Sequence, residues 1–291
     1  MKAPPFSYVR AASIADLFAK WEASDPDARL LAGGQSLLAS LAFRLSEPST
    51  LIDVTRVPEL GGIAAVGGRV RVGALTTHAE LGGNELVRQQ VPLLAEAVPL
   101  IAHPAIRNRG TIGGSLAYAD PAAELPACCV ALDAMILARS ASAERRIPAA
   151  QFFTGPYMTA LGEKELIAAV EFPAREQQER SAILELARRT GDYAMAGVVA
   201  RAQLEGSVLA DTRLVLFGVG EAPIMAHAAA AIVTGRPVTG ETIGRAQAAL
   251  DTDLNPPADQ HGSSEMKRHL ARVLLGRALR RLCGVEEARA A

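Results

Sequence analysis

Two short segments of this chain contain adjacent glycines beside hydroxyl or amide side chains, and they restrict its fold more than any other feature. The first, Ala32-Gly33-Gly34-Gln35-Ser36-Leu37, follows an apolar run typical of a strand end. The second is Thr111-Ile112-Gly113-Gly114-Ser115. Glycine, which has no Cβ, lets successive main-chain N–H groups point into one concavity that suits an anion. Two such segments could hold a pyrophosphate from opposite sides, although two unrelated tight turns would give the same residues.

Other motifs for nucleotide binding or catalysis are missing. No GxxxxGK[ST] segment is present, and the candidate GxGxxG that starts at Gly218 has Pro223 at its third position. No GxSxG, HExxH or Cys/His pairing indicates hydrolysis. Lys plus Arg number 30 and Asp plus Glu 31, so the basic excess typical of nucleic-acid binding is absent. If the glycine segments bind a ligand, a cofactor with its own chemistry fits them best.

The three cysteines and the hydropathy restrict the class of protein further. Cys128 and Cys129 are adjacent and Cys283 is remote, which predicts neither a disulfide framework nor a metal or iron–sulfur site in this chain. The N-terminus has no apolar signal-peptide region, and no apolar run reaches the roughly 18 residues of a membrane span. We therefore expect a soluble, cytoplasmic protein that has no membrane span and does not bind nucleic acid.

Local patterns predict alternating helices and strands in the first part of the chain. Ser13 should cap a helix whose apolar side chains recur at helical spacing through Trp21. Strands are expected at 30–32, 51–54, 131–137 and 165–172, with a β-hairpin at 66–72. Thr77 and Glu80 form a capping box at the start of another helix. His78, in its first turn, is expected to be solvated rather than to ligate a metal.

A polar stretch at 175–181 is the best candidate for a linker, because none of its residues carries an apolar side chain. Beyond it we expect strands at 182–186 and 214–219 and helices at 242–250 and 264–281. The last helix combines an apolar stripe with a basic face of Lys267, Arg268, Arg272, Arg277, Arg280 and Arg281. Such a face is usually solvated, with docking of a partner subunit as the second interpretation.

Four segments, in order along almost the whole chain, resemble the FAD-binding medium subunit of molybdenum hydroxylases, the family of xanthine dehydrogenase and carbon monoxide dehydrogenase. They are Ala32–Ser36, Thr111–Ser115, Ala119–Pro126 and Arg188–Ala194. The resemblance implies an α/β (α+β) fold: a two-lobed FAD-binding domain of the vanillyl-alcohol-oxidase type at 1–175, with lobes of about 1–55 and 56–175. A small α+β C-terminal domain would follow at 176–291.

The resemblance also implies roles for individual residues. The two glycine segments, including Leu37, would hold the FAD pyrophosphate, although many relatives have His or Asn in place of Gln35 and Asn in place of Ser115. Glu124 would bond ribityl or ribose hydroxyls, or it is simply an exposed loop residue. Ile101 and Ile167 would pack on the cofactor or serve as plain core. Tyr193 would lie against the isoalloxazine, with a core tyrosine as the alternative.

The function that the resemblance implies is electron relay. A large molybdopterin subunit would hydroxylate the substrate, and a small subunit with [2Fe–2S] clusters would pass electrons to FAD here, which would reduce an external acceptor. A dimer of heterotrimers is the expected assembly. The chain lacks the cysteine-rich insertion of the 4-hydroxybenzoyl-CoA reductase type. Two alternatives remain: a non-catalytic nucleotide- or phosphate-binding regulator, and a self-sufficient flavin oxidase. The substrate stays open among carbon monoxide, N-heterocycles and aldehydes.

Overall fold

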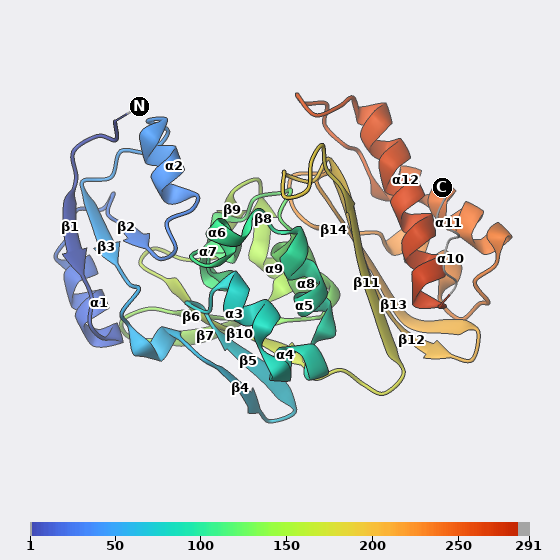
Figure 1. Ribbon diagram of the computed structural model, residues 1–291, viewed down its shortest axis with the longest axis horizontal. Coiled ribbons are helices and arrows are strands. Elements are labelled where there is room, and N and C mark those ends of the chain that lie inside the picture. Colours follow the sequence, from blue (N-terminus) through green and yellow to red (C-terminus); the bar gives the residue numbers. More distant parts are fainter. Residues whose placement is uncertain (1, 285–291) are drawn as a thin grey trace.

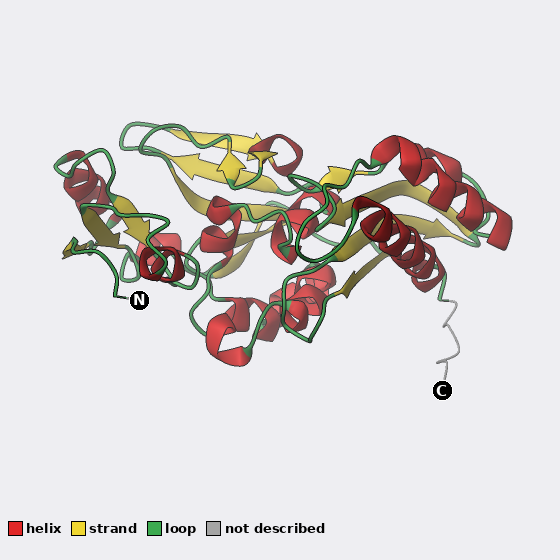
Figure 2. Cartoon of the chain, turned by 90° about the horizontal axis from the view of Figure 1, so that it is seen from above, coloured by secondary structure: helices red, strands yellow, loops and turns green. Residues whose placement is uncertain are grey.

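The computed structural model describes residues 2–284, which lie in three parts along the long axis of the molecule (Figures 1 and 2). Met1 and the last residues of the expected C-terminal domain, 285–291, are outside the described residues. No helix between residues 2 and 284 is long and apolar enough to cross a bilayer.

The first part is a three-stranded parallel sheet in the order β1-β3-β2. Its elements are β1 (Ser7–Arg10), α1 (Ile14–Glu22), β2 (Arg29–Leu31), α2 (Leu37–Ala42) and β3 (Thr50–Asp53). Ser13 caps α1 by accepting a hydrogen bond from the Asp16 main-chain N–H, which confirms the first predicted helix. Both predicted strands are also present, so the first glycine segment directly follows the end of β2.

The second part is a five-stranded antiparallel sheet, β4-β5-β10-β6-β7, with helices packed on one face (Figure 1). Its strands are β4 (Ile63–Val66), β5 (Arg69–Gly73), β6 (Met135–Arg139), β7 (Glu144–Pro148) and β10 (Leu166–Pro173). Its helical segments are η1 (Pro58–Leu60), α3 (His78–Gly83), α4 (Glu85–Gln90), α5 (Pro92–Ala97), η2 (Val98–Leu100), α6 (Pro104–Arg107), α7 (Ile112–Tyr118), α8 (Glu124–Ala131) and α9 (Ala149–Phe152). A small hairpin of β8 (Phe153–Gly155) and β9 (Met158–Thr159) follows α9.

Three predictions for this part are confirmed and one is partly wrong. The strand expected at 165–172 is present as β10. The hairpin pairs Val66 with Arg69, and the capping box of Thr77 and Glu80 is formed. The strand expected at 131–137 begins only at Met135, because the buried helix α8 continues to Ala131. Every residue of α8 is buried, so its sequence has no polar face that would reveal a helix.

The third part is a four-stranded sheet, β11-β12-β13-β14, with three helices on the face away from the second part (Figure 1). Its elements are β11 (Glu179–Leu186), β12 (Ala196–Glu205), β13 (Val208–Phe217), β14 (Ile224–Met225), α10 (His227–Val233), α11 (Gly240–Asp253) and α12 (Ser264–Leu282). The two predicted helices and two predicted strands are present, but the expected linker is shorter than 175–181, since β11 begins at Glu179.

Alternate side chains of this third sheet enter two different cores. Ile183, Val199, Val215 and Phe217 belong to the core of the second part, under α5 and α8. Their neighbours Ala182, Val198, Ala200, Leu214 and Leu216 pack instead against α10–α12. Because successive side chains of a strand point to opposite faces, one sheet serves both cores.

The basic face predicted for α12 is largely engaged within the chain. Lys267 is only 4% exposed, and its ammonium donates to Asp259 Oδ2 (2.6 Å) and to the Gly218 carbonyl (3.1 Å). Arg272 pairs with Asp251, and Arg281 pairs with Glu96 of α5 at 3.1 Å. The expectation of a solvated face is therefore wrong for Lys267, because the segment before α12 supplies a carboxylate for its side chain.

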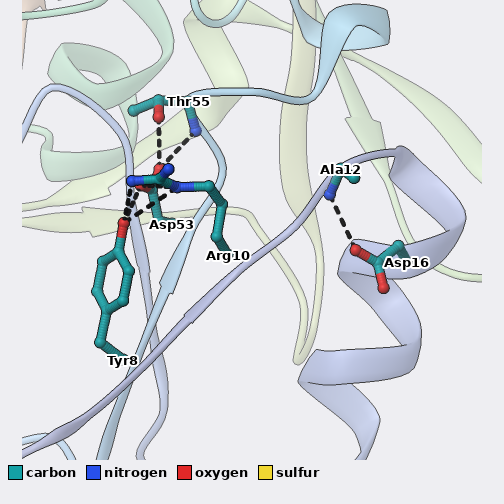
Figure 3. Close-up of polar contacts among 6 residues, drawn as sticks. All are labelled: Tyr8, Arg10, Ala12, Asp16, Asp53 and Thr55. Atoms are coloured by element: carbon teal, nitrogen blue, oxygen red, sulfur yellow. Dashed lines mark hydrogen bonds and ion pairs between the residues drawn. The ribbon is translucent and has the colours of Figure 1, made fainter.

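A buried carboxylate stabilises the first sheet at the end from which the first glycine segment leaves. The Asp53 carboxylate accepts hydrogen bonds from the Thr55 main-chain N–H (2.8 Å) and hydroxyl (2.6 Å), Arg10 Nε (3.0 Å) and the Tyr8 hydroxyl (Figure 3). Burial alone would raise the pKa of Asp53, but these hydrogen bonds lower it to about 2.

Asp53→Asn is expected to lower the unfolding free energy at pH 7 by about 2 kcal/mol, because the folded state favours the ionised carboxylate. A lowered folded-state pKa means that this stabilisation is present above about pH 4 and is lost as the pH falls toward 2. Urea unfolding should therefore show a constant gap between wild type and variant from pH 5 to 7, and about half of it at pH 3. Asp133→Asn, at an exposed ion pair, is the control and should change little. A gap as wide at pH 3 as at pH 7 would contradict the assignment.

Candidate functional site

A cavity of about 590 Å³ lies where all three parts of the chain meet. Its walls come from the first glycine segment and α2, from the second glycine segment and α7, and from the loop at 191–193 that precedes β12. Of the predicted site residues, those lining the cavity are Ala32, Gly33, Gly34, Gln35, Ser36, Leu37, Ile101, Thr111, Gly114, Ser115, Glu124 and Tyr193. The structure thus gathers residues that are up to 161 positions apart, Ala32 and Tyr193, around one space.

The other two predicted site residues lie outside this lining. Gly113 is buried, and a Cβ there would be 2.5 Å from the Ala74 Cβ, so it allows α7 to pack closely on the residue after β5. Ile167 lies in β10 within the core of the second part. Ile167 thus contributes core packing, and both assignments to cofactor binding stay predictions.

The first glycine segment touches the turn that leads into the second one. A Cβ at Gly33 would lie 2.1 Å from the Arg109 carbonyl oxygen and 2.9 Å from the Gly110 Cα. Both contacts are with main chain, which no side-chain rotation could relieve. Glycine at position 33 is therefore what allows the first segment to approach the turn that precedes Thr111.

The first segment presents unpaired hydrogen-bond donors to the cavity. Within residues 2–284, no protein acceptor is found for the main-chain N–H groups of residues 33–37. Gly34 has a φ of +74°, and the Gln35 amide donates to the Gly33 carbonyl at 2.9 Å, which fixes the turn. Ser36 precedes α2 without a side-chain capping bond, so its hydroxyl is not used by the helix. Five successive free N–H groups form a cradle of the kind that binds anions.

The second segment, in contrast, uses four of its five main-chain donors within the protein, those of residues 112–115. The N–H groups of Ile112 and Gly113 donate to the Thr76 and Ala74 carbonyls (3.0 and 2.9 Å). Those of Gly114 and Ser115 donate to the Thr111 hydroxyl and carbonyl oxygens (3.1 and 3.0 Å). The expectation of a main-chain cradle on both sides is thus not met here, and this wall can offer a ligand mainly the hydroxyls of Thr111 and Ser115.

Two carboxyl groups and two aromatic rings line the same cavity. Glu124 is the first residue of α8 and is 8% exposed, and burial, with a contribution from Asp120, raises its pKa to about 7. Burial also raises the pKa of Asp120. Tyr118 and Tyr193 both reach the cavity, and Tyr193 is 63% exposed. Glu124 is therefore not an exposed loop residue, and Tyr193 is not a core tyrosine.

His78 also lines this cavity, and sequence reasoning placed it wrongly. The side chain is buried, 5% exposed, and neither ring nitrogen has a partner with full hydrogen-bond geometry within the described chain. Burial lowers its pKa to about 4, opposed in part by the backbone of Thr111. The capping box correctly located His78 in the first turn of α3, but the turn at Gly110 covers this residue, and no local pattern shows that.

The side chains around the cavity suit the binding of a ligand rather than catalysis by a nucleophilic side chain or a bound metal. Within the part of the chain that the structure describes, no group of three or more His, Cys, Asp or Glu side chains is placed to hold a metal. Cys128 and Cys129 are fully buried in α8, and burial raises the pKa of both thiols. Free N–H donors, hydroxyls and an exposed tyrosine suit an anionic ligand that has a planar ring system.

Comparison with known proteins gives two family matches that together span the chain. Residues 4–175 match the family described as "FAD binding domain in molybdopterin dehydrogenase", and residues 181–282 match "CO dehydrogenase flavoprotein C-terminal domain". The chain belongs to the FAD-binding medium subunits of the molybdenum hydroxylases.

Relatives of this medium subunit are similar to it over almost their whole length. The 6-hydroxypseudooxynicotine dehydrogenase complex subunit alpha of Paenarthrobacter nicotinovorans is 38% identical over 96% of this chain and 95% of its own. Carbon monoxide dehydrogenase from Hydrogenophaga pseudoflava has a chain of 36% identity and TM-score 0.94, covering 97% of this chain and 100% of that one. Quinoline 2-oxidoreductase from Pseudomonas putida 86 has a chain that is 36% identical to this one, with a TM-score of 0.93. The match covers 98% of this chain and 99% of that chain. These matches confirm the predicted fold class, the FAD-binding family and its oxidoreductase character.

Proposed function

We propose that this medium subunit binds one FAD non-covalently in the cavity and relays electrons from the [2Fe–2S] clusters of a small subunit to an external acceptor. The run of unpaired N–H groups at 33–37 carries the proposal, since a half-buried row of free donors in the wall of a cavity suits an anionic partner. FAD supplies a pyrophosphate for that row and, when bound, the redox chemistry that the chain's own side chains lack.

Each wall of the cavity then has a distinct task. The first glycine segment binds the pyrophosphate through main-chain N–H groups and the Ser36 hydroxyl, and Thr111 and Ser115 close the opposite side with hydroxyls. Glu124, with a pKa of about 7, serves the sugar or ribityl hydroxyls as an acceptor when ionised and as a donor when protonated. Tyr193 is exposed and can stack on the isoalloxazine, where buried aromatic surface and π-contact would both stabilise the bound ring. Ile101 adds apolar contact.

The proposed partners follow the division of labour that the resemblance to molybdenum hydroxylases implies. A large subunit would carry the molybdopterin cofactor and a small one the [2Fe–2S] clusters, in a cytoplasmic dimer of heterotrimers. The free cysteines of the described chain are compatible with a reducing compartment. Identity is 36% both to the carbon monoxide dehydrogenase chain and to the quinoline oxidoreductase chain, so similarity of this subunit does not select a substrate. We place the substrate pocket in the large subunit.

The test is flavin binding by the purified full chain. Apoprotein titrated with FAD should quench flavin fluorescence to a 1:1 end point, and denaturation should release all of the flavin. Gly114→Val should weaken binding by about tenfold or more, because its side chain would enter the cavity and crowd the Thr111 hydroxyl, already 2.9 Å from a Cβ at Gly114.

Gly83→Ala is the matched control, since no atom lies within 4 Å of a Cβ at that position. A chain that stays colourless with FAD, alone and after co-purification with its partner subunits, would refute the proposal. A Gly114→Val chain that binds FAD as tightly as wild type would refute the assignment of this wall. Analysis of the co-purified complex for molybdenum and iron tests the partner subunits.

A further inference from the structure

A buried histidine lies beside the point at which the first glycine segment touches the turn before the second one. A Cβ at Gly110 would lie 3.1 Å from His78 Cε1 and 3.2 Å from Nδ1, and Gly110 is also the residue that Gly33 approaches. The main-chain N–H of His78 donates to the Gly110 carbonyl at 2.9 Å, and Thr77 forms a β-bridge with Thr111. The histidine is therefore fixed through its own main chain to the wall of the cavity that the second glycine segment forms, called the second wall below.

The imidazole has polar atoms that the described protein leaves unused. Both ring nitrogens are buried and have no partner with full hydrogen-bond geometry, although the Thr111 main chain lies close to the ring and the side chain lines the cavity. An unsatisfied buried polar group destabilises the folded protein, so a ligand that satisfies it gains that free energy on binding. With a pKa of about 4, the ring is neutral at pH 7 and offers one N–H donor and one acceptor.

The second wall also has few free main-chain N–H donors. Its main-chain N–H groups at 112–115 are all paired within the protein, whereas those of the first wall are free. An anion held between the two segments would therefore find a continuous row of free main-chain donors on one side only. His78 supplies a donor on the other side, next to the closest approach of the two segments.

We propose that His78 is a cofactor-binding residue that donates a hydrogen bond, through its neutral imidazole, to FAD where the two glycine segments meet. This rests on the proposed function, because it assigns the ligand of the cavity to FAD. The expected acceptor is an oxygen of the pyrophosphate, the group that the free N–H row at 33–37 also attracts.

The test compares FAD dissociation constants of wild type and three full-chain variants at pH 7, measured by quenching of flavin fluorescence. His78→Phe keeps a ring of similar size and removes both nitrogens, so we expect FAD affinity to fall about 10- to 100-fold. His78→Asn and His78→Gln place an amide donor near Nδ1 and near Nε2, respectively, and one of them should restore at least part of the affinity. The exposed His227→Phe, on α10, is the control and should bind FAD as wild type does.

Thermal unfolding of the apoproteins separates binding from packing. His78→Phe apoprotein should be at least as stable as wild type, because the substitution removes two unsatisfied buried nitrogens. Loss of affinity together with retained stability supports the proposal. A His78→Phe chain that binds FAD within about twofold of wild type overturns it while leaving the proposed function intact. A wild-type chain that binds no FAD overturns both.

Discussion

Gly33→Ala is expected to abolish measurable FAD binding, with a loss of affinity of about 100-fold or more. The new Cβ would lie 2.1 Å from the Arg109 carbonyl oxygen, a contact with the main chain that only a separation of the two glycine segments can relieve. Such a separation moves the free N–H row away from the opposite wall. Because phosphate contacts are charge-assisted and depend on distance, losing two of them is sufficient for an effect of this size.

The measurement is a fluorescence titration of the apoprotein with FAD, with circular dichroism to confirm that the sheets are retained. Overpacking at this contact should also lower the unfolding free energy by about 1–3 kcal/mol. Gly83→Ala, on α3, has open space around the new Cβ and should leave FAD affinity unchanged. Wild-type affinity in Gly33→Ala would show that the contact between the segments does not matter for the ligand.

Phe217→Ala is expected to destabilise the fold more than any of the glycine substitutions, lowering the unfolding free energy by about 3–5 kcal/mol. The ring is fully buried on β13, opposite Gly197 of β12 in the antiparallel register. A Cβ at Gly197 would lie 2.1 Å from the Phe217 Cζ, so the aromatic ring occupies the space above the glycine. Gly197→Ala should accordingly destabilise as well, by about 1–3 kcal/mol.

The two changes should not be additive, because Phe217→Ala removes the ring that a Cβ at position 197 would strike. In Gly197→Ala/Phe217→Ala the new methyl group enters space that the ring has vacated. Urea unfolding of the wild type, the two single variants and the double variant should then give a coupling free energy of about 1–3 kcal/mol. The double variant should be more stable than the sum of the two single effects predicts. Leu186→Ala, at an exposed position of β11, is the control and should cost little. Simple additivity would show that the ring and the glycine do not compete for one space.

The sequence predicts the features that depend on residues close together in the chain. It does not predict burial or hydrogen bonds that depend on residues far apart in the chain. The Ser13 cap, the hairpin at Val66 and the capping box at Thr77 are local and are all confirmed. The burial of His78 depends on Gly110, which lies 32 positions away, and the use of the second segment's N–H groups depends on Ala74 and Thr76. A capping box shows where a helix begins but not which loop covers its first turn.

One buried strand is missed by the sequence analysis, although the strand expected at 165–172 is confirmed as the almost fully buried β10. β12, the central strand of the third sheet pairing with both β11 and β13, was not predicted, because its Ala-rich sequence lacks the alternation of polar and apolar residues that marks a half-buried strand. Likewise, Lys267 follows the helical pattern of a solvated face, yet Asp259 and the Gly218 carbonyl bury it. In both cases tertiary packing determined the outcome rather than local preference.

The third sheet, β11-β12-β13-β14, contributes side chains to two cores, and this restricts where chimeras between this subunit and its relatives can be joined. A chimera joined at about residue 176 would bring a foreign β11–β13 against native α5 and α8, so Ile183, Val215 and Phe217 would be replaced by side chains that were not selected to fit those helices. A junction after Phe217 keeps that packing but separates the strands from α10–α12, which cover their other face. Neither site isolates a module, so exchange of electron-acceptor or subunit specificity between relatives is better attempted by surface grafting than by swapping halves.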